Sequence, residues 1–200
     1  MLIMLLSIFS QLSPLIYKYG YVGVFLVMIL ESASLPIPSE VILPLTGSLV
    51  AAGFFNFYLV LLIILAGEII GMFIDYYVAY FLGKDVVYKH LDKLHIKRST
   101  LNSFDSWFEK NGAFAVFIAR LLPVVRGLIS FPAGFAMMDR KKFFLYSVAG
   151  SLFWDVVLMM FGYYALKSGS IYAVFTLIAI LGIVLYLIYK AFLNRIGREK

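Results

Sequence analysis

Two arginines, Arg120 and Arg126, lie in a segment, residues 114–138, that is otherwise almost wholly apolar. A charged side chain at the centre of a bilayer costs about 2.5–3.5 kcal/mol to insert, so such residues usually mark a transport pathway or a binding site. Pro123 lies between the two arginines, and Pro132 follows them, which predicts an interrupted helix. Irregular backbone at membrane depth is tolerated only inside the protein or along a cavity. The pattern therefore predicts a site for an anion inside a membrane.

A second interrupted segment carries the opposite charge. Glu31 and Glu40 flank Pro36 and Pro38, and neither proline can donate a backbone hydrogen bond. These prolines, together with those near the arginines, predict that all four charged residues lie in irregular backbone. A glutamate can also gain or lose a proton, which an arginine does not do in proteins. Proton uptake at the glutamates can therefore be linked to occupancy of an anion site.

The composition is typical of a membrane protein. The mean hydropathy is +0.96, and only 14% of the 200 residues are charged, against about 25% in soluble domains. The net charge of +6 is interpreted as the cytoplasmic excess of Lys and Arg rather than as a nucleic-acid surface. The chain has no cysteine, which excludes disulfides and thiolate metal sites. No metal and no cofactor is predicted.

The apolar segments predict an all-α polytopic membrane protein with a single domain over residues 1–200 and two re-entrant helical hairpins. A re-entrant hairpin enters the membrane and turns back, and it is predicted where apolar segments are too short to span alone. The expected elements are an N-terminal apolar helix (1–16), the first re-entrant hairpin (19–53), a transmembrane helix (57–83), a cytoplasmic amphipathic linker (84–111), the second re-entrant hairpin (113–137) and two further transmembrane helices (143–166 and 171–190).

The distribution of basic residues predicts the orientation of these elements. Six Lys or Arg lie within residues 84–110, and Arg140, Lys141 and Lys142 follow the second hairpin. Both stretches face the cytoplasm only if the hairpin between them does not cross the membrane. The first hairpin then enters from outside and the second from inside. Such an inverted repeat with broken segments indicates a transporter with its site near the midplane.

Three further acids lie within the predicted transmembrane helices. Asp75 is interpreted either as a proton relay or arginine partner, or as part of a packing stripe, and Asp155 is treated in the same way. Glu68 is interpreted as facing the bundle or an interface rather than as part of a site. The glycines at positions 67 and 71 are assigned to close helix packing.

The sequence resembles the DedA family of membrane proteins, also called the SNARE-associated or VTT-domain group. The matching residues are Glu31, Pro36-Ile-Pro-Ser-Glu40, Gly47, Gly67, Gly71, Asp75, Gly83, Phe117-Ile-Ala-Arg120-Leu-Leu-Pro-Val-Val-Arg126, Pro132-Ala-Gly134, Gly150, Trp154 and Gly162-Tyr163. The resemblance implies movement of a lipid phosphate, such as undecaprenyl phosphate, or of a phospholipid between leaflets of the cell membrane, with dependence on the proton motive force. It implies that Glu31, Glu40, Arg120 and Arg126 are the functional residues.

Arginine suits the binding of a phosphate because its planar fork can hold two phosphate oxygens at once. Arg120 and Arg126 are therefore predicted to bind the lipid phosphate, and Glu31, Glu40 and Asp75 to couple its movement to protons or cations. Arg120 is also considered as a structural partner of Glu31 or Asp75. The partners expected are the lipid, the membrane and possible further copies of the chain, but no nucleic acid.

Other interpretations remain open. The four charged residues can instead form a buried ion-pair cluster that only stabilises the fold. The same architecture suits a small-ion or drug/proton antiporter. An enzyme acting on lipid phosphates is disfavoured because no nucleophile or metal set accompanies the arginines. A scaffold without transport activity would leave the buried charges without a role.

Overall fold

The computed structural model describes residues 14, 16–35, 37–83, 98–123 and 125–168. This part of the chain is helical and contains no strand, which confirms the all-helical prediction for it. The helices are α2 (Tyr21–Ser32), α3 (Ser39–Ala51), α4 (Phe57–Leu82), α6 (Arg98–Arg120), α7 (Val125–Leu128), α8 (Ser130–Phe135) and α9 (Arg140–Ser168). The predicted helices 1–16 and 171–190, and the linker up to residue 97, lie wholly or almost wholly outside the described residues.

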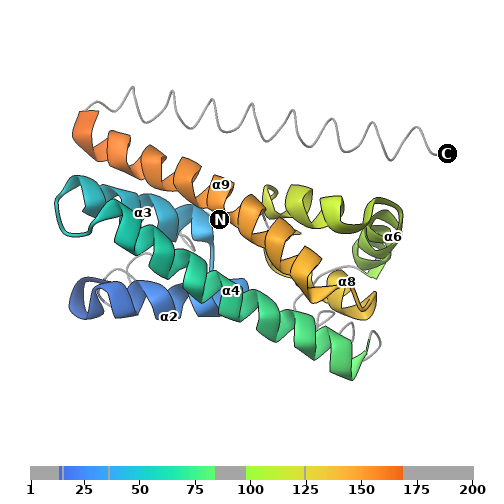
Figure 1. The fold of residues 1–200 in the computed structure, drawn as a ribbon. Coiled ribbons are helices and arrows are strands. Elements are labelled where there is room, and N and C mark those ends of the chain that lie inside the picture. The colour runs from blue at the N-terminus through green and yellow to red at the C-terminus, as the bar shows by residue number, and fades with distance from the viewer. Residues whose placement is uncertain (1–13, 15, 36, 84–97, 124, 169–200) are drawn as a thin grey trace.

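Two long helices, α4 and α9, form the axis of the fold and run antiparallel (Figure 1). They have 26 and 29 residues, which corresponds to about 39 and 43 Å against a hydrocarbon core of about 30 Å. Both are long and apolar enough to cross a membrane. The side chain of Asn56 caps the start of α4 by accepting a hydrogen bond from the Leu59 N–H at 3.1 Å.

The helices α2 and α3 form the first broken pair, in which six residues, 33–38, separate two short helices. The prediction of irregular backbone at the glutamates is wrong. Glu31 lies in the last turn of α2 and Glu40 in the first turn of α3. The helix resumes directly after Pro38 because the first turn of a helix needs no backbone donor from that position.

The second broken pair consists of the C-terminal part of α6 together with α7 and α8. Gly112, with φ 56°, kinks α6 at the position where the sequence predicts the end of the linker. Arg120 is the last residue of α6 and Arg126 lies in the short helix α7. The arginines are therefore also at helix ends rather than in irregular backbone. Among the described residues, the helices of this pair are interrupted at residues 121–123 and again at Ile129.

Each broken pair has two arms, the helices on either side of its break, and packs one arm on α4 and the other on α9. The arm α2 packs on the first half of α4, and α8 packs on its second half. On α9, α6 packs on the first half and α3 on the second half. Figure 1 accordingly shows the first broken pair at one end of the long helices and the second broken pair at the other. The tip of each pair is the region around the break between its arms. The two tips therefore meet near the middle of α4 and α9.

Glycines allow the closest of these contacts. A Cβ atom at Gly162 of α9 would lie 1.8 Å from the carbonyl oxygen of Pro44 in α3. A Cβ atom at Gly47 of α3 would lie 1.9 Å from the carbonyl oxygen of Met159 in α9. Since no side chain fits at such distances, the α3–α9 contact depends on both glycines.

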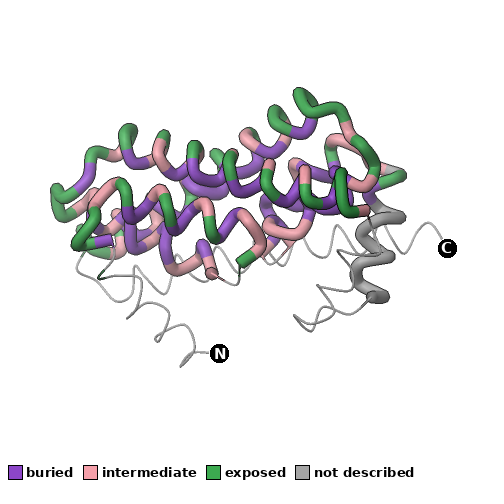
Figure 2. The backbone as a smooth tube through the Cα atoms, turned by 90° about the horizontal axis from the view of Figure 1, so that it is seen from below, coloured by how far each residue is buried: buried purple, intermediate pink, exposed green. Residues whose placement is uncertain are grey.

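The outer surface of the bundle is strongly apolar. Buried positions face the interior between the helices, and exposed positions follow the outside (Figure 2). Large apolar side chains such as Tyr58, Leu62, Phe81 and Leu145 are each more than half exposed. An exposed apolar surface of this extent fits hydrocarbon rather than water as the surrounding medium. The fold therefore fits a helical membrane protein.

Candidate functional site

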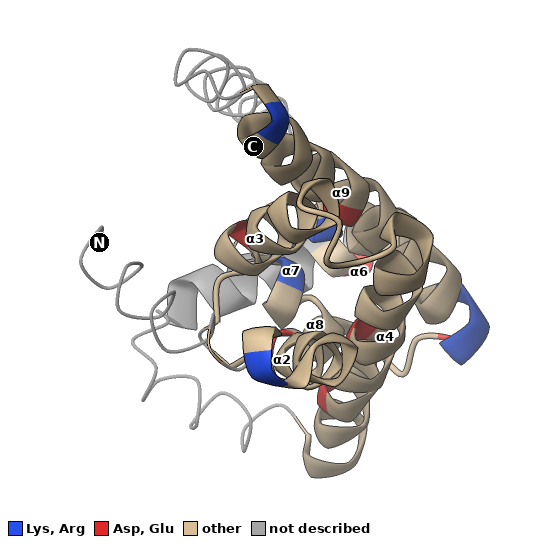
Figure 3. Ribbon diagram, turned by 90° about the vertical axis from the view of Figure 1, so that its left-hand side faces the viewer, with Lys and Arg blue, Asp and Glu red and all other residues tan. Residues whose placement is uncertain are grey.

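The guanidinium group of Arg126 is the centre of a buried charged cluster. It meets three carboxylates, each on a different helix: Glu31 of α2, with Nε and Oε1 3.6 Å apart, Glu68 of α4, to which Nη2 donates a hydrogen bond, and Asp155 of α9, with Nη2 and Oδ1 3.7 Å apart. All four side chains are buried. Figure 3 shows α7 in the interior of the bundle, with acidic positions on the neighbouring helices. Four segments far apart in the sequence thus converge on one arginine.

Several polar atoms of this cluster lack hydrogen-bond partners. Within the described part of the chain, Nη1 of Arg126, Oε2 of Glu68 and both carboxylate oxygens of Asp155 are buried without such a partner. The indole nitrogen of Trp154 is also without one, although its ring lies 5.9 Å from the guanidinium carbon of Arg126. Buried polar groups are nearly always satisfied, so a group of unsatisfied ones calls for a functional explanation.

Arg120 has a different environment from that of Arg126. It is 1% exposed and donates hydrogen bonds to the carbonyl oxygen of Arg126 at 2.8 Å and to Oγ of Ser130 at 2.9 Å. No carboxylate of the described residues lies within 4 Å of it. The alternative in which Arg120 pairs with Glu31 or Asp75 is therefore not supported, because the guanidinium group points toward α7 and α8. Among the described residues, the hydrogen-bond partners of its guanidinium group are neutral oxygens.

Asp75 lies where the tips of the two broken pairs meet. Its carboxylate accepts a hydrogen bond from the hydroxyl of Ser34, which belongs to the break between α2 and α3. The same hydroxyl oxygen lies 3.1 Å from the carbonyl oxygen of Gly127 in α7. Asp75 is 4% exposed. The structure thus places Asp75 at the contact of both tips, and Asp75 forms no ion pair with another described residue.

Glu40 lies at the edge of this arrangement. It is half-buried at the start of α3, and it makes no ion pair within the described part of the chain. Its charge still acts on Arg126, although more weakly than the charges of Glu68, Glu31 and Asp155. Of the five predicted site residues, the structure therefore brings Arg126 and Glu31 into contact, links Arg120 through the Arg126 backbone, and leaves Glu40 more accessible.

Glu68 and Asp155 are the members of the cluster that the sequence analysis did not assign to the site. Both are fully buried and both contact Arg126. Glu68 does face the bundle, as predicted, but it faces the arginine. Their signal in the sequence was the charge itself, since an ionisable residue in an apolar span usually faces a functional interior. The sequence leaves Asp155 open between an arginine partner or proton relay and a packing stripe, and the contact with Arg126 favours the arginine partner.

The balance of charge indicates what the cluster can do. Three carboxylates surround the single guanidinium of Arg126, and Asp75 adds a fourth buried acid against the two arginines. A buried excess of negative charge is expensive in a medium of low dielectric constant. The cluster can lower this cost by taking up protons or a cation, and the guanidinium groups can bind an anion when carboxylates are neutralised.

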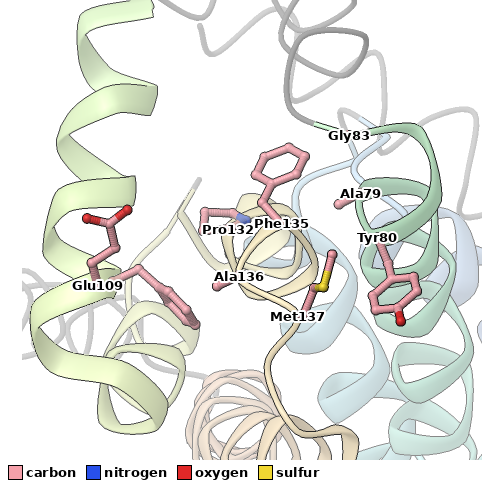
Figure 4. A pocket seen from close by; sticks show the side chains of 9 residues that line it. Ala79, Tyr80, Gly83, Glu109, Pro132, Phe135, Ala136 and Met137 are labelled. Atoms are coloured by element: carbon pink, nitrogen blue, oxygen red, sulfur yellow. The ribbon is translucent and has the colours of Figure 1, made fainter.

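An apolar pocket lies away from the cluster, at the C-terminal end of α4 (Figure 4). Its volume is about 280 Å³. Its lining residues come from α4, α6, α8 and the chain that leaves α8, and they are Ala79, Tyr80, Gly83, Phe108, Glu109, Pro132, Phe135, Ala136 and Met137. Apart from Glu109, the lining suits an apolar group better than a phosphate.

Comparison with known proteins identifies the family. The model of the VTT domain matches residues 37–164, which include α3, α4, both arginines and nearly all of α9. The chain belongs to the VTT-domain family, the DedA family of the resemblance described above. No solved structure matches this chain.

The relatives of this chain carry different names. Undecaprenyl phosphate transporter A of Staphylococcus aureus is 30% identical over 155 residues, which cover 76% of each chain. Protein DedA of Escherichia coli is 26% identical over 168 residues, covering 80% of this chain and 76% of its own. A protein of Lactococcus lactis subsp. lactis called alkaline phosphatase-like protein is 30% identical over 154 residues, which cover 72% of this chain and 70% of the relative.

Proposed function

We propose that this protein translocates a lipid phosphate between the leaflets of the cell membrane, with Arg120 and Arg126 as the phosphate-binding residues. The observation that carries this proposal is the burial of two guanidinium groups at helix ends midway along α4 and α9. The name of the Staphylococcus aureus relative supports undecaprenyl phosphate or a similar polyprenyl phosphate as the substrate. A phospholipid is the other lipid of this chemical class.

The two arginines bind the phosphate in different ways in this proposal. The partners of Arg120 in the described part of the chain are neutral oxygens, so a phosphate replaces weak partners with a charged one. Arg126 already has carboxylate partners, so a phosphate must compete with Glu31, Glu68 and Asp155. Protonation of these carboxyls weakens their hold on Arg126 and frees it for the phosphate. Proton uptake and phosphate binding then favour each other.

Two further acids complete this coupling scheme. Glu40 is half-buried and exchanges protons or cations with the aqueous side. Asp75 is buried at the contact of the two tips and carries a proton within the protein. Glu31 couples directly, since its carboxylate touches Arg126.

The same proposal includes the membrane topology. Both broken pairs are re-entrant hairpins, the first from outside and the second from the cytoplasm, and they form an inverted repeat. The exchange of arms on α4 and α9 supports this assignment, because each hairpin packs one arm on each long helix. Single cysteines introduced into this cysteine-free chain test it by labelling in intact cells. Phe54 is the suitable outside position because it is half exposed, whereas Phe55 is buried.

We expect external labelling at Phe54→Cys and Lys167→Cys, and protection at Lys141→Cys until the membrane is permeabilised. Positions 93 and 200 are also expected to be cytoplasmic, but they lie outside the described residues. Labelling of both Phe54→Cys and Lys141→Cys from outside would exclude the re-entrant topology.

Reconstitution tests the function. Purified protein in liposomes is supplied with labelled polyprenyl phosphate or phospholipid, with and without a pH or sodium gradient, and the label reaching the opposite leaflet is measured. We expect movement of the polyprenyl phosphate that is faster with the gradient. Flux of a soluble ion or drug without any lipid movement would favour an antiporter. Release of inorganic phosphate from the lipid would favour an enzyme.

A further inference from the structure

We propose that Ser34 is a positioning residue that connects the protonation of Asp75 to the contact between the tips of the two broken pairs. The basis is a count of hydrogen atoms. The Ser34 hydroxyl lies against two acceptors, the carboxylate of Asp75 in α4 and the carbonyl oxygen of Gly127 in α7 at 3.1 Å. A hydroxyl carries only one hydrogen and two lone pairs.

When Asp75 is ionised, its carboxylate can only accept. The single hydrogen of Ser34 then points to Asp75, because a hydrogen bond to a charged acceptor is the stronger one. The carbonyl oxygen of Gly127 faces the Ser34 oxygen without a hydrogen between them, and the contact between the tips is lost or repulsive. The ionised state therefore favours separation of the tips.

When Asp75 is protonated, both contacts can be made at once. The carboxyl hydrogen of Asp75 is donated to Oγ of Ser34, and the hydroxyl hydrogen of Ser34 is donated to the Gly127 carbonyl. One proton thus completes a chain from α4 through the first tip to the second tip. The protonated state therefore holds the two tips together.

The surroundings support a switch at this position. Asp75 is buried, and Arg120 of α6 is the charged group of the described residues that acts on it. Arg120 also donates a hydrogen bond to the carbonyl oxygen of Arg126, which is next to Gly127 in the chain. The same short segment of α7 therefore contacts both Arg120 and Ser34. Ser34 itself has φ 56°, a conformation that glycine adopts freely. Replacement by glycine therefore removes the hydroxyl without straining the backbone.

The inference rests on the proposed proton coupling but can be tested without lipid. Spin labels are attached to Leu35→Cys in the first tip and Leu128→Cys in the second, and the dipolar broadening between them is recorded in nanodiscs from acid to alkaline pH. We expect strong broadening at acid pH that decreases as the pH rises. Asp75→Asn should keep strong broadening at every pH, because its amide always donates to Ser34. Ser34→Gly should abolish the pH response.

The matched control is Ser48→Ala, which removes a hydroxyl that donates a hydrogen bond within its own helix, to the Leu45 carbonyl at 2.7 Å. This variant should retain the pH response of the parent. A parent protein whose broadening does not change with pH, or a Ser34→Gly variant that responds like the parent, overturns the proposal. If Ser34→Gly does not insert, a pH response retained in Asp75→Asn overturns it equally.

Lipid movement measured on the same samples separates this inference from the proposed function. If the contact between the tips depends on pH but no lipid moves, the Ser34 proposal stands and the lipid-transport proposal is contradicted. If lipid moves but the contact does not depend on pH, the lipid-transport proposal stands and the Ser34 proposal is contradicted.

Discussion

The two broken pairs are built on the same plan but present different chemistry at their tips. Each places one arm on α4 and the other on α9. The first pair has two helices of 12 and 13 residues, and its tip carries a buried Glu31, a half-buried Glu40 and the hydroxyl of Ser34. The second pair is divided further, into the end of α6, α7 and α8, and buries both arginines.

The difference shows how a repeated scaffold can form an asymmetric site. Similar packing brings both tips to the middle of the bundle, where an acidic tip meets a basic one. The cost of burying the arginines is lowered by the carboxylate of Glu31 from the other tip and by acids of the long helices. The scaffold thus positions the charges, whereas the residue types at the tips determine what binds.

The largest effect is expected for Arg126→Lys. Arg126 contacts three carboxylates from Nε and Nη2, and a lysine ammonium cannot reproduce that planar fork. Lipid transport in liposomes should fall about tenfold or more, which corresponds to about 1.4 kcal/mol in the barrier. The control is Arg140→Lys, at an exposed arginine 3.5 Å from the Tyr77 hydroxyl, which should transport normally. Wild-type transport by Arg126→Lys would favour the purely structural ion-pair cluster.

The packing of the first pair on α9 should be broken by Gly162→Ala. The added Cβ would lie 1.8 Å from the Pro44 carbonyl oxygen, so α3 and α9 must separate. Overpacking of this kind costs about 1–3 kcal/mol, occasionally more, and we expect the upper part of that range. Thermal unfolding in detergent, followed by tryptophan fluorescence, measures the loss. An unchanged melting temperature would show that this contact is not as close as described.

Replacement of the two acids of the first tip should lower transport to different extents. Glu31→Gln removes a carboxylate that touches Arg126, and it should lower proton-driven transport severalfold and flatten its pH dependence. Glu40→Gln removes a half-buried acid without an ion pair to the described residues, and its effect should be smaller, about twofold. The measurement is transport into liposomes as a function of pH. If both variants behave as the parent does, neither glutamate is a coupling residue.

The smallest effect is expected for Gly127→Ala at the second tip. A Cβ there would meet Ser34 Oγ at 3.8 Å, which is an ordinary van der Waals contact. The free energy of unfolding should change by less than about 0.5 kcal/mol, as for most substitutions without a specific packing or backbone conflict. The same fluorescence melt used for Gly162→Ala provides the comparison. A loss as large as that of Gly162→Ala would mean that the tips approach more closely than these distances indicate.

The sequence by itself determined the class, the breaks and the family of this protein. An apolar run without proline from Phe57 to Leu82 predicts a long helix, because nothing in it interrupts the backbone hydrogen bonds. The prolines between Glu31 and Glu40 and at position 123 predict interruptions. The arginine motif pointed to the VTT-domain family, to which the chain belongs.

Only the tertiary structure decided which charges meet. Glu68 and Arg126 are 58 residues apart in the chain, and their contact depends on how the second broken pair packs on α4. That packing includes the close approach of Gly134 in α8 to the Tyr76 carbonyl of α4, which no local pattern specifies. Local sequence determines where a helix can form and end, because the backbone hydrogen bonds are local. The partner of a buried charge depends on the packing of distant helices, and so Arg126 rather than Arg120 became the centre of the carboxylates.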